Sequence, residues 1–142
     1  MAFKKTARDI MTSTVITAKE DMLITDVIKL LLRWHISGLP IVDNDGNLVG
    51  IITEHDVVNF ALSGQAADTV ASEVMTKKVV TYSPDTLAVE IINYFAAHRI
   101  RRVPVVEGSK VVGIISRRDI VRYMDQMYSR LVAKEEETEI EI

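Results

Sequence analysis

Two short segments of the chain combine a hydroxyl with a carboxylate three residues later: Thr53–Asp56 (TEHD) and Ser116–Asp119 (SRRD). Each follows a β-branched run and precedes an apolar helical pattern, so we expect each hydroxyl at a helix N-terminus. Free backbone N–H groups and the helix dipole favour an anion there. The carboxylates of Asp56 and Asp119 are acceptors suited to the two hydroxyls of a ribose. A sugar phosphate requires this combination of donors and acceptors.

The same spacing also has a purely structural interpretation. Ser or Thr followed three residues later by an acid, before an apolar helix, is close to a capping box, which stabilises a helix without any ligand. A capped helix can still bind an anion, so both interpretations stay open. No nucleophile is paired with a base near Asp56 or Asp119, so we expect no catalytic residues.

Both segments belong to a tandem repeat that covers most of the 142 residues. Four matched pairs are 64 positions apart: Met11 and Met75, Thr12 and Thr76, Thr17 and Thr81, and Pro40 and Pro104. Gly50 and Gly113 are 63 apart, because the second copy has lost one residue in the turn before the glycine. A register held over this length indicates a duplication.

Each copy predicts the element order β-α-β-β-α. The first strands are expected at 14–18 and 78–82, followed by helices with Asp21 and Asp85 as N-caps. Helical spacing of Leu23, Val27, Leu31 and Trp34 predicts the buried face of the first helix. A strand hairpin and a second helix complete each copy.

The predicted fold class is α+β, with two repeats packed face to face about a pseudo-twofold axis and two related clefts between them. We predict the first repeat at 6–62, a linker at 63–72, the second repeat at 73–131 and a disordered acidic tail at 132–142. Each unit alone is small for independent stability, which favours packing of the two.

Composition narrows the function classes. The net charge is −3, and there are no cysteines, which excludes disulfides and thiolate metal sites and fits a reducing cytoplasm. His35, His55 and His98 are not at ligand spacing with one another, so we expect no metal site. No signal peptide or membrane-spanning run is recognisable, and we expect a cytoplasmic protein without a membrane partner.

The ordered motifs resemble the paired cystathionine-β-synthase-type repeats, known as CBS pairs or Bateman modules. They are DIMT and EVMT, HISGLPIVD and HRIRRVPVVE, and GIITEHD and GIISRRD, and they extend from Thr6 to about Met124. Because nothing catalytic remains outside them, the chain looks like a free-standing pair. The resemblance implies a regulatory sensor that binds AMP, ADP, ATP, S-adenosylmethionine or NAD between repeats, with no cofactor. It also implies a dimer of pairs.

By the same resemblance, each Thr/Ser-x-x-Asp segment faces the other repeat. The first cleft would contain Thr53, Asp56, Thr81, Arg101 and Arg102, and the second would contain Ile16, Thr17, Ser37, Gly38, Ser116 and Asp119. Arginine suits phosphate through its planar donor fork. We therefore expect the first cleft to be the better phosphate site, and the second to prefer a nucleoside, a less charged ligand or nothing.

Two further features leave alternatives open. The second repeat is rich in arginine, but no motif that reads nucleic acid is present, so we do not expect nucleic-acid binding. An apolar stripe indicates either a homodimer contact or core packing, and it consists of Ile120, Tyr123, Met124, Met127 and Leu131. The competing function is a ligand-free dimerisation or assembly module. The regulated partner cannot be identified from the sequence.

Overall fold

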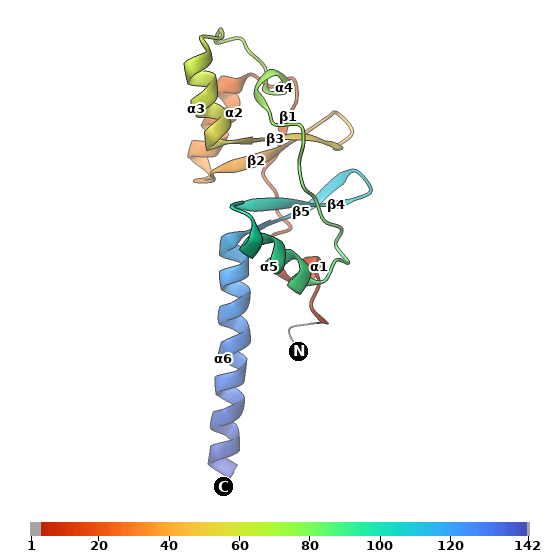
Figure 1. The fold of residues 1–142 in the computed structure, drawn as a ribbon, viewed down its shortest axis with the longest axis vertical. Helices are drawn as coiled ribbons and strands as arrows, with labels where there is room; N and C mark the ends of the chain where they lie inside the picture. Colours follow the sequence, from red (N-terminus) through yellow and green to blue (C-terminus); the bar gives the residue numbers. More distant parts are fainter. Residues whose placement is uncertain (1–3, 142) are drawn as a thin grey trace.

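The computed structural model describes residues 4–141, with side chains as far as Lys134. Two α+β lobes lie one above the other, and a long C-terminal helix projects from the second lobe (Figure 1). This architecture agrees with the predicted fold class. Within the described residues, no helix combines the length and the apolar character needed to cross a membrane.

The first lobe consists of a three-stranded sheet and two helices. Its strands, in sheet order, are β1 (Ala18–Lys19), β2 (Gly38–Val42) and β3 (Leu48–Thr53), and its helices are α2 (Ile24–Arg33) and α3 (Glu54–Ser63). β1 is parallel to β2, and β3 is antiparallel to it. As predicted, Val27 and Leu31 are buried on one face of α2. Leu23 and Trp34, which flank the helix, were predicted on the same face but are 40% and 52% exposed.

The second lobe contains a two-stranded hairpin, β4 (Arg102–Glu107) with β5 (Lys110–Ser116), and the helices α5 (Ala88–Ala97) and α6 (Arg117–Glu141). The strand predicted at 78–82 is only an isolated bridge between Tyr82 and Val105, and the one predicted at 14–18 is reduced to β1. Most of these two segments is therefore extended chain outside the sheets.

Two short helices have exchanged places between the lobes. α1 (Ala7–Ile10) buries its apolar residues in the core of the second lobe, whereas α4 (Ala71–Val74) packs in the core of the first (Figure 1). The backbone of the following segment pairs with the same lobe, because Thr12 bonds with Ile114 and Thr76 with Ile51, all at 2.9 Å. Each lobe is thus completed by the first segment of the other sequence repeat.

This exchange also explains where α2 and α5 begin. The predicted N-caps Asp21 and Asp85 are wrong, because α2 starts after Leu23 and α5 after Leu87. The first helical N–H of α2 donates to the carbonyl of Thr69 at 2.9 Å, and that of α5 donates to the carbonyl of Lys5 at 2.8 Å. The exchanged backbone therefore satisfies donors that a capping side chain would otherwise have to meet.

The C-terminal segment differs from its prediction in backbone structure. α6 continues to Glu141, where the sequence analysis expected a disordered tail from residue 132. Residues 133–137 are alanine, lysine and glutamate, which have high helix propensity, so the helix can extend without tertiary support. The side chains after Lys134 lie outside the described residues.

The glycine in each repeated motif lies beneath an exchanged Met-Thr segment. A Cβ added at Gly50 would lie 2.6 Å from Met75 Sδ and 2.9 Å from the carbonyl oxygen of Thr76. A Cβ at Gly113 would meet the side chain of Met11, with Cγ at 2.9 Å. The methionine and the glycine therefore recur in register because they contact each other across the two repeats.

We predict that Gly50→Ala lowers the free energy of unfolding by about 1–3 kcal/mol, the usual cost of overpacking. Gly113→Ala should cost less, because its nearest atoms all belong to the flexible Met11 side chain, whereas Gly50 also approaches backbone. Urea denaturation of the two matched variants tests this order. An equal or larger loss for Gly113→Ala would contradict it.

Candidate functional site

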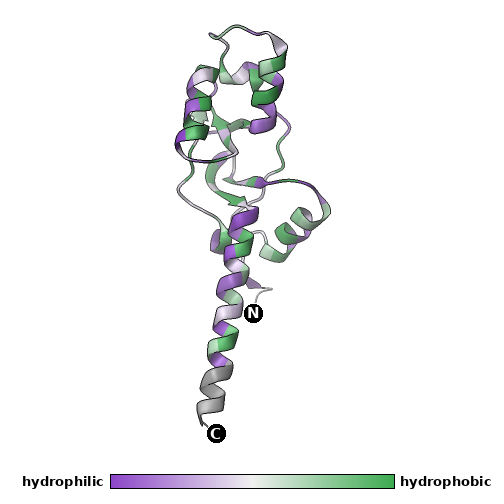
Figure 2. Ribbon diagram, turned by 90° about the vertical axis from the view of Figure 1, so that its left-hand side faces the viewer, coloured by the Kyte–Doolittle hydropathy of each residue, from purple (hydrophilic) through white to green (hydrophobic). Residues whose placement is uncertain are grey.

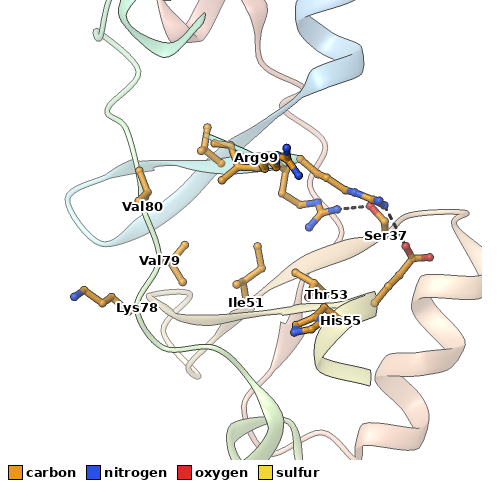
Figure 3. Close-up of a pocket in the computed structure, with 13 residues that line it drawn as sticks. Ser37, Ile51, Thr53, His55, Lys78, Val79, Val80 and Arg99 are labelled. Carbon is orange, nitrogen blue, oxygen red and sulfur yellow. Dashed lines mark hydrogen bonds and ion pairs between the residues drawn. The ribbon is translucent and has the colours of Figure 1, made fainter. Parts of the chain in front are cut away.

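A cavity of about 440 Å³ lies between the two lobes (Figure 3). Thr53, at the end of β3, and His55, in the first turn of α3, lie on one side, and the residues at the start of β4 lie on the other. The extended segment 78–80 forms a third wall (Figure 3). The complete lining is Ser37, Ile51, Thr53, Glu54, His55, Lys78, Val79, Val80, Arg99, Ile100, Arg101, Arg102 and Val103. We call it the first cleft.

Positive charge dominates the first cleft. Lys78, Arg99, Arg101 and Arg102 line it, and Glu54 is the acidic residue of the lining. Arg101 Nη1 is 3.4 Å from Glu54 Oε1, and both side chains are mostly exposed. Burial, followed by the neighbouring charge of Arg101, lowers the pKa of the Arg102 guanidinium, while Glu54 opposes this effect. A bound anion would relieve this concentration of positive charge.

An apolar surface accompanies these cations. Ile51, Val79, Val80, Ile100 and Val103 contribute aliphatic side chains from both lobes and from the connecting segment. A flat, weakly polar group could bury its faces there while an anionic group met the arginines. Pockets that combine apolar walls with a few convergent polar groups are typical of small-molecule sites.

A second cleft of about 350 Å³ occupies the pseudo-equivalent place. It is lined by Thr12, Thr14, Val15, Ile16, His35, Ile36, Ser37, Gly38, Arg102, Ile114, Ser116, Arg118 and Asp119. The cations here are Arg102 and Arg118, and Asp119 contributes an opposing charge. The second cleft is therefore less positive than the first, although equivalent elements of the two repeats build both.

The two motif carboxylates are buried, with Asp56 8% and Asp119 4% exposed. Asp56 Oδ2 accepts from the backbone N–H of Thr53 at 2.9 Å and from its hydroxyl at 3.0 Å, while Oδ1 accepts from the Thr76 hydroxyl at 2.8 Å. The capping-box interpretation is thus correct for α3, where Thr53 is the N-cap. Thr76 belongs to the exchanged segment, so the same carboxylate joins the two repeats.

Asp119 repeats this pattern with one addition. Its Oδ2 accepts from the N–H of Ser116 at 2.7 Å and from the Ser116 hydroxyl at 2.9 Å. Its Oδ1 accepts from the Thr12 hydroxyl at 2.7 Å and from Arg122 at 2.8 Å. Both oxygens of each carboxylate are therefore already hydrogen-bonded within the protein. A ligand hydroxyl would have to share them or replace a threonine.

Most of the predicted site residues line the clefts expected for them. Thr53, Arg101 and Arg102 line the first, and Ile16, Ser37, Gly38, Ser116 and Asp119 line the second. Asp56 lies behind Thr53 and is not part of the lining, and neither Thr81 nor Thr17 reaches its cleft wall. The ligand-binding roles of all these residues remain predictions.

Lys78 and Val79 were not predicted from the sequence, and they supply a cation and an apolar side chain to the first cleft beside Val80. The repeat itself contained the signal, because Val80 is 64 positions after Ile16, which was predicted for the second cleft. Thr14 and Val15, the counterparts of Lys78 and Val79, line the second cleft in the same way.

The histidines are separate from one another in the structure. His55 lines the first cleft, His35 lines the second, and His98 stacks on Tyr94 with ring centroids 4.0 Å apart. Among the described residues, no group of three or more His, Asp or Glu side chains is placed to hold a metal ion.

The sequence and the architecture are both similar to those of known proteins. The chain is 36% identical over 119 residues to inosine-5'-monophosphate dehydrogenase of Methanocaldococcus jannaschii, and this alignment covers 83% of this chain but only 23% of that protein. The chain thus spans about a quarter of the length of this relative.

Solved structures match over nearly their whole length. The structure of CBSX2 in complex with AMP superposes with a TM-score of 0.80 at 25% identity, covering 87% of this chain and 98% of that one. The CBS domain pair of protein MJ0100, in complex with 5'-methylthioadenosine and S-adenosyl-L-methionine, superposes with a TM-score of 0.76 at 32% identity and the same coverage.

The profile of the CBS domain matches twice, at residues 7–63 and 70–126. Each match covers one of the two sequence repeats. Each also contains the short helix, α1 or α4, that packs in the lobe of the other repeat. The chain therefore belongs to the CBS domain family and contains a tandem CBS pair.

Proposed function

We propose that this protein is a regulatory, ligand-sensing module that binds adenosine-containing ligands, with AMP, ADP or ATP as the preferred class. The observation that carries the proposal is the first cleft, where four cationic residues and an apolar wall converge between the two repeats. Phosphate would meet the arginines, and adenine would lie against Val79, Val80 and Ile100.

The ligands of the structural neighbours support this choice. CBSX2 was solved with AMP, and the MJ0100 pair with 5'-methylthioadenosine and S-adenosyl-L-methionine, so both neighbours hold adenosine compounds. We propose a binding role rather than catalysis, in the cytoplasm, and without nucleic acid as partner. S-adenosylmethionine and NAD are the other ligands to test.

Because the clefts differ in charge, we propose that they bind different ligands. The first cleft, with Lys78, Arg99 and Arg101 in addition to Arg102, is proposed as the phosphate site. The second, where Asp119 opposes Arg102 and Arg118, is proposed to take a nucleoside or a less charged ligand.

A ligand in either cleft would contact both repeats, so its affinity would depend on their relative orientation. Such a ligand shifts the population of arrangements only by its differential affinity for them. A partner protein could bind one arrangement in preference to another. Regulation would then follow from a small change in orientation at the cleft, transmitted to the surface of the pair.

The alternative, a ligand-free assembly module, has its own observations. Asp56 and Asp119 are fully hydrogen-bonded by the protein, as helix caps require. Within the α6 stripe, Ile120 and Tyr123 pack on the second core, but Leu131 is 49% exposed, and the adjoining Tyr128 and Val132 are 58% and 51% exposed. Figure 2 shows hydrophobic residues continuing along the projecting part of α6.

We also propose that α6 pairs with α6 of a second copy, giving a homodimer. An exposed apolar stripe on a projecting helix is a usual contact surface, and a twofold dimer is the commonest assembly. Dimerisation and ligand sensing are compatible, because the clefts and the projecting part of α6 do not share residues.

Isothermal titration calorimetry with AMP tests the ligand. We expect micromolar binding that falls at least tenfold in Arg101→Ala with Arg102→Ala, because both charge-assisted contacts to phosphate are lost. Adenosine should bind the wild type more weakly than AMP. The exposed Arg33→Ala on α2 is the matched control and should bind as wild type. Unchanged AMP affinity in the double variant would disprove the phosphate assignment. No heat with any ligand would favour the assembly module.

Asp56→Ala should destabilise the protein even without ligand, by about 2 kcal/mol, because it removes the capping box of α3 and leaves the Thr76 hydroxyl without its acceptor. Glu54→Ala, which removes only an exposed ion pair, should change stability by less than about 0.5 kcal/mol. Chemical denaturation measures both. Equal stabilities would mean that the buried carboxylate does not hold the repeats together.

The dimer is tested by sedimentation velocity. Tyr128→Glu with Leu131→Glu places charges on the exposed stripe and should convert the dimer to a monomer. Ser129→Glu, on the opposite face of the same turn, should leave the dimer intact. A wild-type protein that sediments as a monomer at tens of micromolar would rule out the dimer.

A further inference from the structure

Arg102 lies at the boundary between the two clefts. It and Ser37 line both cavities, and the guanidinium donates a hydrogen bond to the Ser37 hydroxyl (Figure 3). Among the described residues that line the two clefts, these two are the ones they share. A single cationic group is therefore within reach of ligands on either side.

The repeat explains why one arginine occupies this place. Arg102 is 64 positions after Gly38, so the two residues are counterparts across the pseudo-twofold axis. A Cβ at Gly38 would lie 2.8 Å from Cζ of Arg102 and in contact with its Nη1. The first repeat thus provides the space, and the second provides the side chain that fills it. Two side chains of this size could not both fit.

The electrostatic surroundings make the guanidinium responsive to an anion. Its present hydrogen-bond partner is a neutral hydroxyl, and the nearby charges are the like charges of Arg101 and Arg117 and the opposing charge of Glu54. Partial burial weakens solvent screening, so a ligand phosphate near Arg102 would gain more than one at an exposed arginine. A planar guanidinium can direct its paired donors towards one phosphate at a time.

We propose that Arg102 couples the two clefts, so that a phosphate-bearing ligand in one lowers the affinity of the other for a second phosphate-bearing ligand. This inference rests on the proposed nucleotide binding. The first phosphate draws the guanidinium to its own side, and the second cleft then keeps Arg118 and Asp119, whose charges cancel. An uncharged nucleoside in the second cleft does not compete for Arg102. The pair then holds one nucleotide and one neutral ligand more readily than two nucleotides.

Site-resolved binding is measurable because the chain has three histidines in three different places. The imidazole proton NMR signal of His55 reports the first cleft, and that of His35 reports the second. His98, which lines neither cleft, is the internal control. AMP titrations therefore give a separate dissociation constant for each cleft in one experiment.

The test is a cycle of four proteins: wild type, Lys78→Glu with Arg99→Glu, Arg102→Gln, and all three changes together. The Lys78 and Arg99 changes empty the first cleft without touching the second. AMP binding in the second cleft, followed at His35, should then be about tenfold tighter than in the wild type with its first cleft filled. A tenfold change is within the usual range of coupling between two sites. In the Arg102→Gln background the same changes should alter the affinity at His35 less than twofold.

Arg101→Gln is the matched control, because Arg101 lines only the first cleft. It should weaken the isotherm at His55 and leave the coupling in place. Arg102→Lys keeps the charge but not the planar pair of donors, so it should retain part of the coupling, which distinguishes loss of the charge from misfolding in Arg102→Gln.

The outcomes separate the two proposals. If both histidines respond to AMP but emptying the first cleft does not change the affinity at His35, coupling through Arg102 is wrong while nucleotide binding stands. If only the His55 signal shifts with AMP in the wild type, the coupling predicts that the His35 signal shifts once the first cleft is emptied. A His35 signal that still does not shift would overturn the coupling. If neither histidine responds, the proposed function fails, and the coupling fails with it.

Discussion

The structure depends on a hydrogen bond that occurs twice, from the threonine of one repeat to a buried carboxylate of the other. Thr76 donates to Asp56 at 2.8 Å, and Thr12 donates to Asp119 at 2.7 Å. Each carboxylate also caps the helix behind it. Each exchanged segment is thereby held in the lobe that it completes, so each lobe is built from both sequence repeats before any ligand arrives. Removing either carboxylate would disturb a helix start and an inter-repeat contact together.

From this near-symmetric frame, a few substitutions produce two different sites. Ser37 and Gly38 in the first repeat correspond to Arg101 and Arg102 in the second, so both arginines come from the same half of the molecule. Lys78 has Thr14 as its counterpart, which adds to the charge of the first cleft alone. The pair thus keeps one architecture while its clefts acquire distinct chemistry, and Arg102 lies where the two meet.

Local patterns predicted the longer helices and the two hairpins, but not the reduction of the strands expected at 14–18 and 78–82 or the contacts between distant segments. The spacing of Val27 and Leu31 predicted the buried face of α2, and the Thr53–Asp56 motif predicted a helix cap that the structure contains. The start of α2 after Leu23 was missed, because its first N–H bonds with Thr69, a residue 45 positions away. Contacts between segments so far apart in the chain produce no pattern in the local sequence. The contribution of Lys78 and Val79 to the cleft wall was missed because β-branched residues such as Val79 suit a cavity wall as well as a strand.

The central claim is that a nucleotide binds between the repeats and touches both. The most direct test is the amide NMR spectrum of the protein titrated with AMP. The account predicts that signals of Thr53, Val80 and Arg101 shift together in one saturable isotherm, because these residues line one cleft from separate segments. Signals of α2 residues far from the cleft should stay in place. A spectrum that does not change, or shifts confined to the surface of one lobe, would contradict it.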